Sequence, residues 1–286
     1  MLLLVRSIPL LAQQQEADAA WAEGRYDAAR SAYLRVLAKN PRDVRANLRL
    51  GVMLSWQGKL DSALVLLGRA RAGDPADVEI RLIEARVLAW DKQYPAALGR
   101  YDSLLAEYPR LREATLDRAR TLAWAGRLDN SRALYRQMIA NDSTDRDAML
   151  GAAQVGAWKG ELDVAEQEYH RLLSRNGRDV DARIGLGYVY LWQGRLGAAA
   201  RQADYALTID STAKSARELR HAVGEANGSA LEGSVNWSDD SDHNTSFWQT
   251  LGASAPVGDR FRVFGAVNAL QTRDPVRHAR RVGAEG

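Results

Sequence analysis

Apolar residues recur at intervals of three and four along most of the chain, which is the spacing of helices that bury one face. Between about residue 13 and residue 225 this pattern repeats as a whole every 34 residues. One slot of the repeat holds residues that favour turns, namely Pro41, Pro75, Pro109, Ser143, Gly177 and Ser211. Counted from this slot, six copies begin near residues 10, 44, 78, 112, 146 and 180. The pattern therefore predicts six copies of one helical unit.

Each copy carries the signals of two helices joined by a turn. Position 15 of the copy is glycine in five cases, which suits the end of a helix, and Lys92 in the third copy. Small residues at positions 8 and 20 allow two helices to approach closely, and larger residues fill positions 17 and 24. Because such a hairpin is too thin to cover its own apolar face, we expect the copies to stack into a solenoid over residues 13–225. A last helix from Lys214 to about Glu225 would cap it.

The pattern changes after residue 225. Residues 226–229 read A-N-G-S, a turn-forming linker, and the following residues alternate with a period of two. Three strands are predicted within residues 226–286. One face is expected to carry Leu231, Gly233, Val235, Trp237, Phe247, Leu251, Ala253, Ala255, Phe261, Val263, Val267 and Ala269, and the other Glu232, Ser234, Asn236, Trp248, Thr250, Ser254, Arg262 and Asn268.

These strands fit two kinds of antiparallel sheet. A short P-V-G-D-R turn joins the second strand to the third, whereas longer polar stretches lie before the second and after the third. Short turns at one end and long polar loops at the other are typical of an outer-membrane barrel; a soluble antiparallel sheet is the alternative. Since the smallest barrels need about eight strands, these strands predict either a truncated barrel or pairing with another chain. We expect the truncated barrel.

A tryptophan recurs at position 13 of five copies: Trp56, Trp90, Trp124, Trp158 and Trp192. At about 100° per residue this position points away from the face that packs on the partner helix. Position 9 holds Arg86, Arg120 and Tyr188 in three copies, and an arginine four residues before a tryptophan is spaced for a cation–π pair. Two interpretations stay open: the indoles pack against the next repeat, or they form a ligand-binding surface.

Composition removes several kinds of chemistry. The net charge of +3 comes from 39 basic and 36 acidic residues without a basic block, which gives nucleic-acid binding no support. There is no cysteine, and the four histidines are not spaced as metal ligands. Asp240, Asp242 and Asn244 lack the glycine and closing glutamate of a calcium loop. We therefore expect no metal, no cofactor, no catalytic residue and no enzyme.

The amino terminus carries an apolar stretch, M-L-L-L-V-R-S-I-P-L-L-A-Q, that ends at the small residue Ala12. Residues 1–12 are interpreted either as the remnant of a secretory signal or as a frayed first helix. No run of about 18 apolar residues predicts a transmembrane helix.

Small residues, glycine, an aromatic residue and proline at a period of 34 resemble the tetratricopeptide repeat family over roughly residues 13–213. The resemblance implies a right-handed α-solenoid of about six hairpins. It also implies a concave groove, lined by positions 2, 5, 9, 12 and 13 of each first helix, that binds protein or peptide partners. The groove residues would include the five tryptophans, Arg86, Arg120 and Tyr188, and the indole faces would suit sugar rings or an extended peptide.

Repeats that run directly into strands containing G-S-V-N-W-S-D-D-S-D-H-N, G-A-S-A-P-V-G-D-R and R-D-P-V-R resemble the YaiO-type outer-membrane proteins. The layout is more remotely similar to the outer-membrane export subunits for cellulose and poly-N-acetylglucosamine. This resemblance implies a scaffold of the bacterial periplasm and outer membrane that works in outer-membrane assembly or polysaccharide export. The alternative is a generic soluble interaction module of the cytoplasm with a small β appendage. A glycan-processing enzyme would need a carboxylate pair, and the sequence singles out none.

Overall fold

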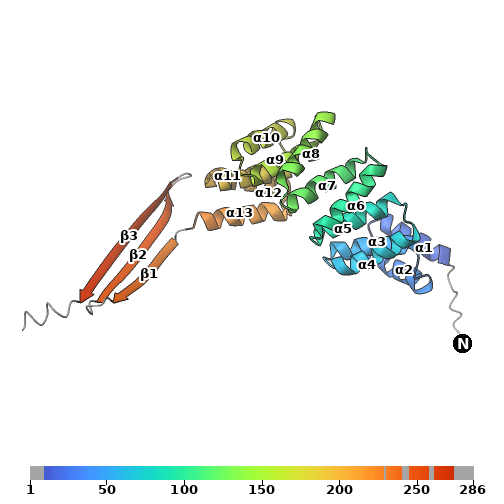
Figure 1. Cartoon of the computed structure of the whole chain (residues 1–286), viewed down its shortest axis with the longest axis horizontal. Coiled ribbons are helices and arrows are strands. Elements are labelled where there is room, and N and C mark those ends of the chain that lie inside the picture. The colour runs from blue at the N-terminus through green and yellow to red at the C-terminus, as the bar shows by residue number, and fades with distance from the viewer. Residues whose placement is uncertain (1–9, 229, 240–244, 258–260, 274–286) are drawn as a thin grey trace, which may run out of the picture. The chain divides into compact units, whose positions relative to one another are not determined.

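The computed structural model describes residues 10–228, 230–239, 245–257 and 261–273. The chain divides into two compact units, Met1–Lys159 and Gly160–Gly286, which are described separately. The described part of the first unit contains nine helices, shown in chain order in Figure 1: α1 (Leu10–Ala22), α2 (Tyr26–Lys39), α3 (Val44–Trp56), α4 (Leu60–Gly73), α5 (Val78–Trp90), α6 (Tyr94–Glu107), α7 (Arg112–Trp124), α8 (Leu128–Asn141) and α9 (Arg146–Trp158).

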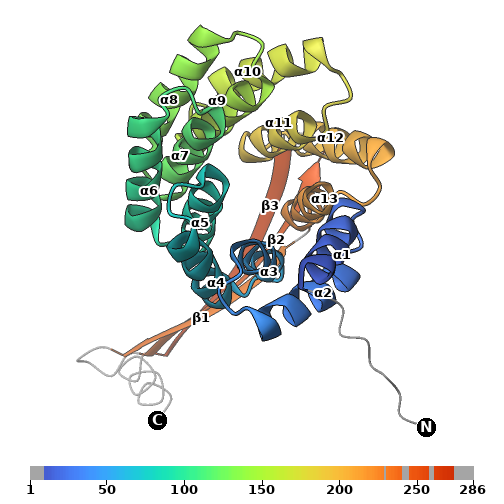
Figure 2. The same ribbon diagram turned by 90° about the vertical axis from the view of Figure 1, so that its right-hand side faces the viewer.

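The described part of the second unit contains four helices and three strands. They are α10 (Leu162–Arg175), α11 (Val180–Trp192), α12 (Leu196–Ile209), α13 (Lys214–Ala226), β1 (Ala230–Asp239), β2 (Thr245–Val257) and β3 (Phe261–Arg273). In both units every first helix of a repeat begins at the predicted residue, and a second view shows successive helices of the repeats side by side (Figure 2). The six-fold repeat and the final helix from Lys214 are therefore confirmed. Residues 1–9 lie outside the described residues, and Leu10–Ala12 belong to α1.

The turn inside each repeat needs a left-handed residue. Position 15 has a positive φ in five repeats, from 71° at Gly24 to 80° at Gly160, and glycine adopts this conformation without a steric cost. Lys92 takes the same conformation with a φ of 61°. The third repeat thus keeps the turn although its side chain strains the backbone.

The apolar pattern does not include the residue that fixes the start of four first helices. Asp43, Asp77, Asp145 and Asp179 precede α3, α5, α9 and α11, and each carboxylate accepts a hydrogen bond from the amide three residues later, at 2.9 to 3.1 Å. Such N-caps satisfy one of the amides that a helix start leaves without a partner. The aspartates recur at position 34 of the repeat.

The apolar core of the first unit is continuous along the chain. Buried clusters join α1 to α3, α3 to α5, α5 to α7 and α7 to α9, so no hairpin holds a core of its own. The small residues at positions 8 and 20 are buried as predicted; Ser131 at position 20 donates a hydrogen bond of 2.7 Å to the carbonyl of Ala119 at position 8.

In two places a tyrosine at position 24 packs against a glycine at position 6 of the next repeat. Tyr135 lies against Gly151 and Tyr169 lies against Gly185, where a Cβ would meet the ring atoms at impossibly short distances. Gly187 has the same role against Leu219. Gly185 and Gly187 are therefore packing positions.

In the second unit, α11 packs on α10, α12 and α13, and the strands form one open antiparallel sheet in the order β1-β2-β3. The register pairs Val235 with Gln249, Leu251 with Val267, and Ala255 with Val263, which places the predicted apolar residues on one face. The opposite face is less polar than predicted, because this face carries Phe264 and Leu270 in addition to Trp248. Asp240, Asp242 and Asn244 lie outside the described residues.

Candidate functional site

The repeated tryptophans end the first helices. Trp56, Trp90, Trp124 and Trp158 are the last residues of α3, α5, α7 and α9, and we call these four the tryptophan row. Their side chains are 54%, 41%, 42% and 40% exposed, respectively. Trp192 ends α11 in the second unit and is 48% exposed. Each indole thus has a covered part and an open part, and none belongs to the buried clusters of the described core.

Position 5 behaves differently from the expected groove lining. Leu48 and Leu116 are 4% and 5% exposed and belong to the core clusters between neighbouring repeats. A leucine between successive first helices removes apolar surface from water on both sides. Position 5 therefore contributes to stacking, although Leu82, Leu150 and Ile184 stay partly open. Position 13 is exposed wherever it is tryptophan, position 2 is exposed in most repeats, and position 9 ranges from buried Val52 to exposed Arg120.

Arg86 and Arg120 bind one shared carboxylate. Arg86 on α5 reaches Asp117 on α7 through Nε at 3.0 Å and Nη2 at 2.6 Å, and Arg120 contacts the other oxygen of Asp117 at 3.2 Å. The Asp117 side chain is 9% exposed, whereas both guanidinium groups are partly open. Two cations on one anion leave one positive charge in excess beside the tryptophan row.

The expected cation–π pairs do not form. In the part of the chain that the structure describes, guanidinium groups lie over other rings: Arg49 over Trp21 at 4.9 Å, Arg183 over Tyr205 at 3.7 Å and Arg195 over Tyr190 at 4.2 Å. A buried carboxylate attracts a guanidinium more strongly than an exposed ring does, because the charge is poorly screened there. Asp117 at position 6 therefore draws Arg86 and Arg120 away from the tryptophans. The spacing of three residues between Asp117 and Arg120 indicated one of these two ion pairs in the sequence.

Two buried tyrosines lie next to this charge cluster. Burial, together with the negative charge of Asp117, raises the pKa of Tyr101 above its usual range. Burial also raises the pKa of Tyr135 to about 12, with a smaller opposing effect from Arg120. Both phenols therefore stay neutral at any physiological pH, and the charge of the cluster is that of Arg86, Arg120 and Asp117.

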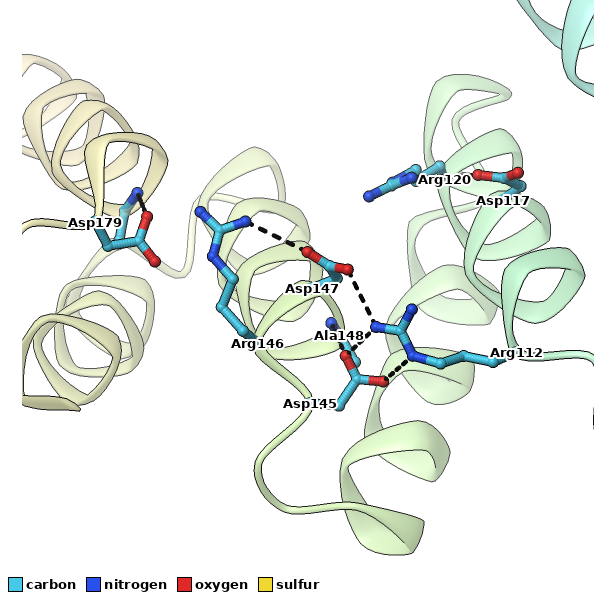
Figure 3. A network of polar contacts seen from close by, with 9 residues as sticks. Arg112, Asp117, Arg120, Asp145, Arg146, Asp147, Ala148 and Asp179 are labelled. Atoms are coloured by element: carbon cyan, nitrogen blue, oxygen red, sulfur yellow. Dashed lines mark hydrogen bonds and ion pairs between the residues drawn. The ribbon is translucent and has the colours of Figure 1, made fainter. Parts of the chain in front are cut away.

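A second network ties the start of α7 to the start of α9 (Figure 3). Arg112 donates from Nε and Nη2 to the two oxygens of Asp145, at 2.9 and 2.7 Å, and from Nη2 to Asp147 at 3.1 Å. Burial opposes ionisation of Asp145, but its hydrogen bonds from Arg112 and from the Ala148 amide hold its pKa below the ordinary value. This network is structural, since it fixes the N-cap of one helix to its neighbour.

Each unit also holds an aromatic cluster around one of the repeated tryptophans. In the first unit Trp21 stacks on Trp56 with ring centroids 5.5 Å apart, and Tyr26 meets Trp56 edge-on at 5.0 Å. In the second unit Tyr188 lies beside Trp192 at 5.9 Å, so these two predicted residues are neighbours. The sequence did not identify Trp21 and Tyr26 as site residues, because neither stands at position 13 of the first copy. Trp21 lies one position before that slot and Tyr26 four positions after it.

No group of three or more histidine and acidic side chains is arranged to hold a metal ion within the described residues. None of the helices described is both long enough and apolar enough to cross a membrane.

Comparison with known proteins identifies the family. Two family profiles, both described as tetratricopeptide repeat, match residues 20–87 and residues 84–146 and 159–214, which together are more than half of the chain. The chain therefore belongs to the tetratricopeptide repeat family. A search of curated proteins gives no match.

Solved structures agree with this assignment. A tetratricopeptide repeat protein of Thermus thermophilus is 26% identical with a TM-score of 0.55, over 64% of this chain and 98% of its own. PilW, described as a type IV pilus biogenesis factor, is 17% identical with a TM-score of 0.61, over 74% and 99%. A repeat protein of Parabacteroides merdae is 18% identical with a TM-score of 0.53, over 75% and 98%.

Fold and family together define the class of protein. Tetratricopeptide repeat proteins bind protein or peptide partners, and this chain is a repeat solenoid of that kind, a protein–protein interaction module, with an open three-stranded sheet after it.

Proposed function

We propose that this chain is a non-enzymatic scaffold of the bacterial envelope. In this proposal the tryptophan row, with Arg86 and Arg120, binds an extended segment of a partner protein. The strands associate with the outer membrane, and the repeats work in the periplasm in outer-membrane assembly or polysaccharide export.

The exposure of the tryptophan row is the observation that carries the binding proposal. A tryptophan buries about 150–250 Å² when it packs fully, and leaving four indoles about half open forgoes much of that stabilisation. Exposed aromatic residues that recur at one edge of stacked repeats are typical of a binding surface, because they supply contact area at a small entropic cost.

The charge beside the row favours an acidic polypeptide. Arg86 and Arg120 share Asp117 and keep partly open guanidinium groups, which suit carboxylate groups of a ligand. A polysaccharide is the second candidate, since open indole faces also stack on sugar rings. A neutral glycan would use the indoles without the arginines, so the two ligands are separable by mutation.

The test measures how a double tryptophan variant binds acidic peptides. Trp90→Ala with Trp124→Ala should leave the helical circular dichroism and the melting temperature nearly unchanged. The double variant should weaken binding of acidic peptides, measured by tryptophan fluorescence, by roughly tenfold or more. Tyr108→Ala is the matched control, because Tyr108 is similarly exposed but lies outside the row. A large fall in the melting temperature of the double variant would assign the indoles to the fold instead.

The exposed sheet supports the membrane part of the proposal. Val235, Trp237 and Val267 share one face and are 65%, 70% and 73% exposed. A soluble antiparallel sheet normally covers one face with a core, and apolar side chains this open on both edge strands of one sheet call for lipid or a protein cover. Lipid is the cover that we propose.

Neighbouring residues of β3 allow a matched membrane test. Val267→Lys places a charge on the apolar face, and Asn268→Lys places the same charge on the opposite face. If the apolar face meets lipid, Val267→Lys should reduce co-flotation with phosphatidylcholine vesicles, since a lysine in the bilayer costs about 2 kcal/mol or more. Equal flotation of both variants, or no flotation of the parent chain, would favour a soluble interaction module and a cytoplasmic location.

A further inference from the structure

A cavity of about 450 Å³ lies between α4, α5 and α6 of the first unit, on side chains that the tryptophan row does not use. Its lining is rich in arginine and includes Arg71, Arg81, Arg100, Ser103 and Glu107. The volume is in the range of sites for small ligands.

A buried carboxylate behind the cavity holds two of its arginines. Glu84 is 7% exposed, and its Oε2 lies 3.1 Å from Nε of Arg71 and 3.5 Å from Nε of Arg100. Neither contact has hydrogen-bond geometry: Glu84 Oε2 and Arg71 Nε are buried atoms without a hydrogen-bond partner in the described structure. Charge attraction alone therefore keeps the two guanidinium groups near the cavity, and no directional bond locks them.

The outer ends of these two arginines are unused. Within the described residues, the Nη atoms of Arg71 and Arg100 make no hydrogen bond, although both side chains line the cavity and are about 40% exposed. The third arginine, Arg81, binds Glu107 at 2.6 Å, and Glu107 is 51% exposed at the rim. Three guanidinium groups thus face one buried and one displaceable carboxylate.

The charge count identifies the ligand class. Three arginines against Glu84 and Glu107 leave a net charge of +1, and the count becomes +2 when a ligand displaces Glu107 from Arg81. A phosphate group carries close to two negative charges at neutral pH, and guanidinium groups bind it in a bidentate manner. We propose that this cavity binds the phosphate group of a small phosphorylated molecule.

Two neighbouring cavities lack these properties. In the one lined by Arg42, Arg45 and Arg49, four acidic residues also line the wall, and Arg45 and Arg49 are bound to Asp18 and Glu79 at 2.7 Å. In the other, Arg110 and Arg112 stand against Asp142 and Asp145, so there is no excess of cations, and Arg112 is already bound by Asp145 and Asp147. The cavity behind Arg71 and Arg100 thus combines an excess of cations with unused donors.

The test is calorimetry of the full chain with inorganic phosphate, glucose 6-phosphate and glucose, at low ionic strength and a pH of about 7.5. Both phosphates should bind and glucose should not. Arg71→Gln and Arg100→Gln, made singly so that Glu84 keeps one cation, should each weaken phosphate binding roughly tenfold or more. Arg69→Gln, an exposed position on the same helix, is the control and should bind as the parent does.

Melting temperatures within a few degrees of the parent would show that the variants are folded. Failure of both phosphates to bind the parent chain would overturn the proposal. So would an equal loss of binding in the Arg69→Gln control. Because the cavity shares no residue with the tryptophan row, either result leaves the proposed protein-binding function untouched.

Discussion

Gly151→Ala is expected to destabilise the first unit although alanine is the better helix former. Gly151 lies inside α9, where replacing glycine by alanine normally contributes about 1 kcal/mol of stability. Here the new Cβ would overlap the Tyr135 ring, with Cε2 at 2.8 Å as the furthest of its three contacts. Tyr135 is 2% exposed, so the ring has no open space into which it can move. Overpacking of this kind costs about 1–3 kcal/mol, and after the gain from alanine we expect a net loss of up to about 2 kcal/mol.

Gly99→Ala is the matched control. Gly99 is also inside a helix, α6, and a Cβ there would have no atom within 4 Å, so this variant should be more stable by up to about 1 kcal/mol. The repeat itself suggests a rescue. Where position 24 is Leu67, position 6 of the next repeat is the larger Ile83, so Tyr135→Leu should make alanine at position 151 tolerable.

The assay is urea denaturation followed by circular dichroism at pH 7. The dependence of the unfolding free energy on urea concentration should first be shown to be equal for all variants. If a solenoid unfolds in parts, a single free energy of unfolding is not defined. The double-mutant cycle of Gly151→Ala and Tyr135→Leu should give a favourable coupling of about 1 kcal/mol or more. If Gly151→Ala were as stabilising as Gly99→Ala, the matching of tyrosine to glycine between repeats would be refuted.

Three further outcomes are expected. Lys92→Gly should raise stability by about 0.5–1 kcal/mol, because a lysine at a φ of 61° is strained; thermal denaturation that shows no gain would contradict this. Arg112→Met should cost about 1–3 kcal/mol of stability at pH 7. Because the pKa of Asp145 is lowered in the folded state, the difference in stability between the variant and the parent should shrink as the pH falls below about 4. Urea denaturation at several pH values would detect this change. Tyr33→Phe removes a buried hydroxyl that donates to Asp18 at 2.7 Å and should cost about 1 kcal/mol; an unchanged urea midpoint would show that the bond is not stabilising.

Much of the fold could be predicted because local sequence signals mark where the elements of each repeat begin and turn. Glycine at position 15 marks the turn, the tryptophan ends the first helix, and the alternation after residue 226 becomes three antiparallel strands. These signals act over a few residues, so local backbone preference and the 3.6-residue or two-residue period are sufficient to read them. The stacking followed as well, since a bare hairpin leaves its apolar face in water.

The candidate site was less predictable. Its tryptophans were found by their period, but their half-open state depends on how neighbouring helices cover each ring. The partner of Arg86 is Asp117, which lies 31 residues away on the next first helix. The spacing of Arg86 from Trp90 along the chain does not show whether the arginine will contact the ring or this carboxylate. Leu48 and Leu116 were expected on an open face and are buried for the same reason.

The sequence by itself determined the repeat, the start of each first helix, the strands and the family. Only the tertiary structure decided which glycine faces a tyrosine, which carboxylate two arginines share, and that Arg71 and Arg100 meet around Glu84 beside a cavity. The physical reason is the range of the forces involved. Secondary structure follows from neighbours along the chain, whereas burial and charge pairing depend on side chains that only the stacking of repeats brings within contact distance.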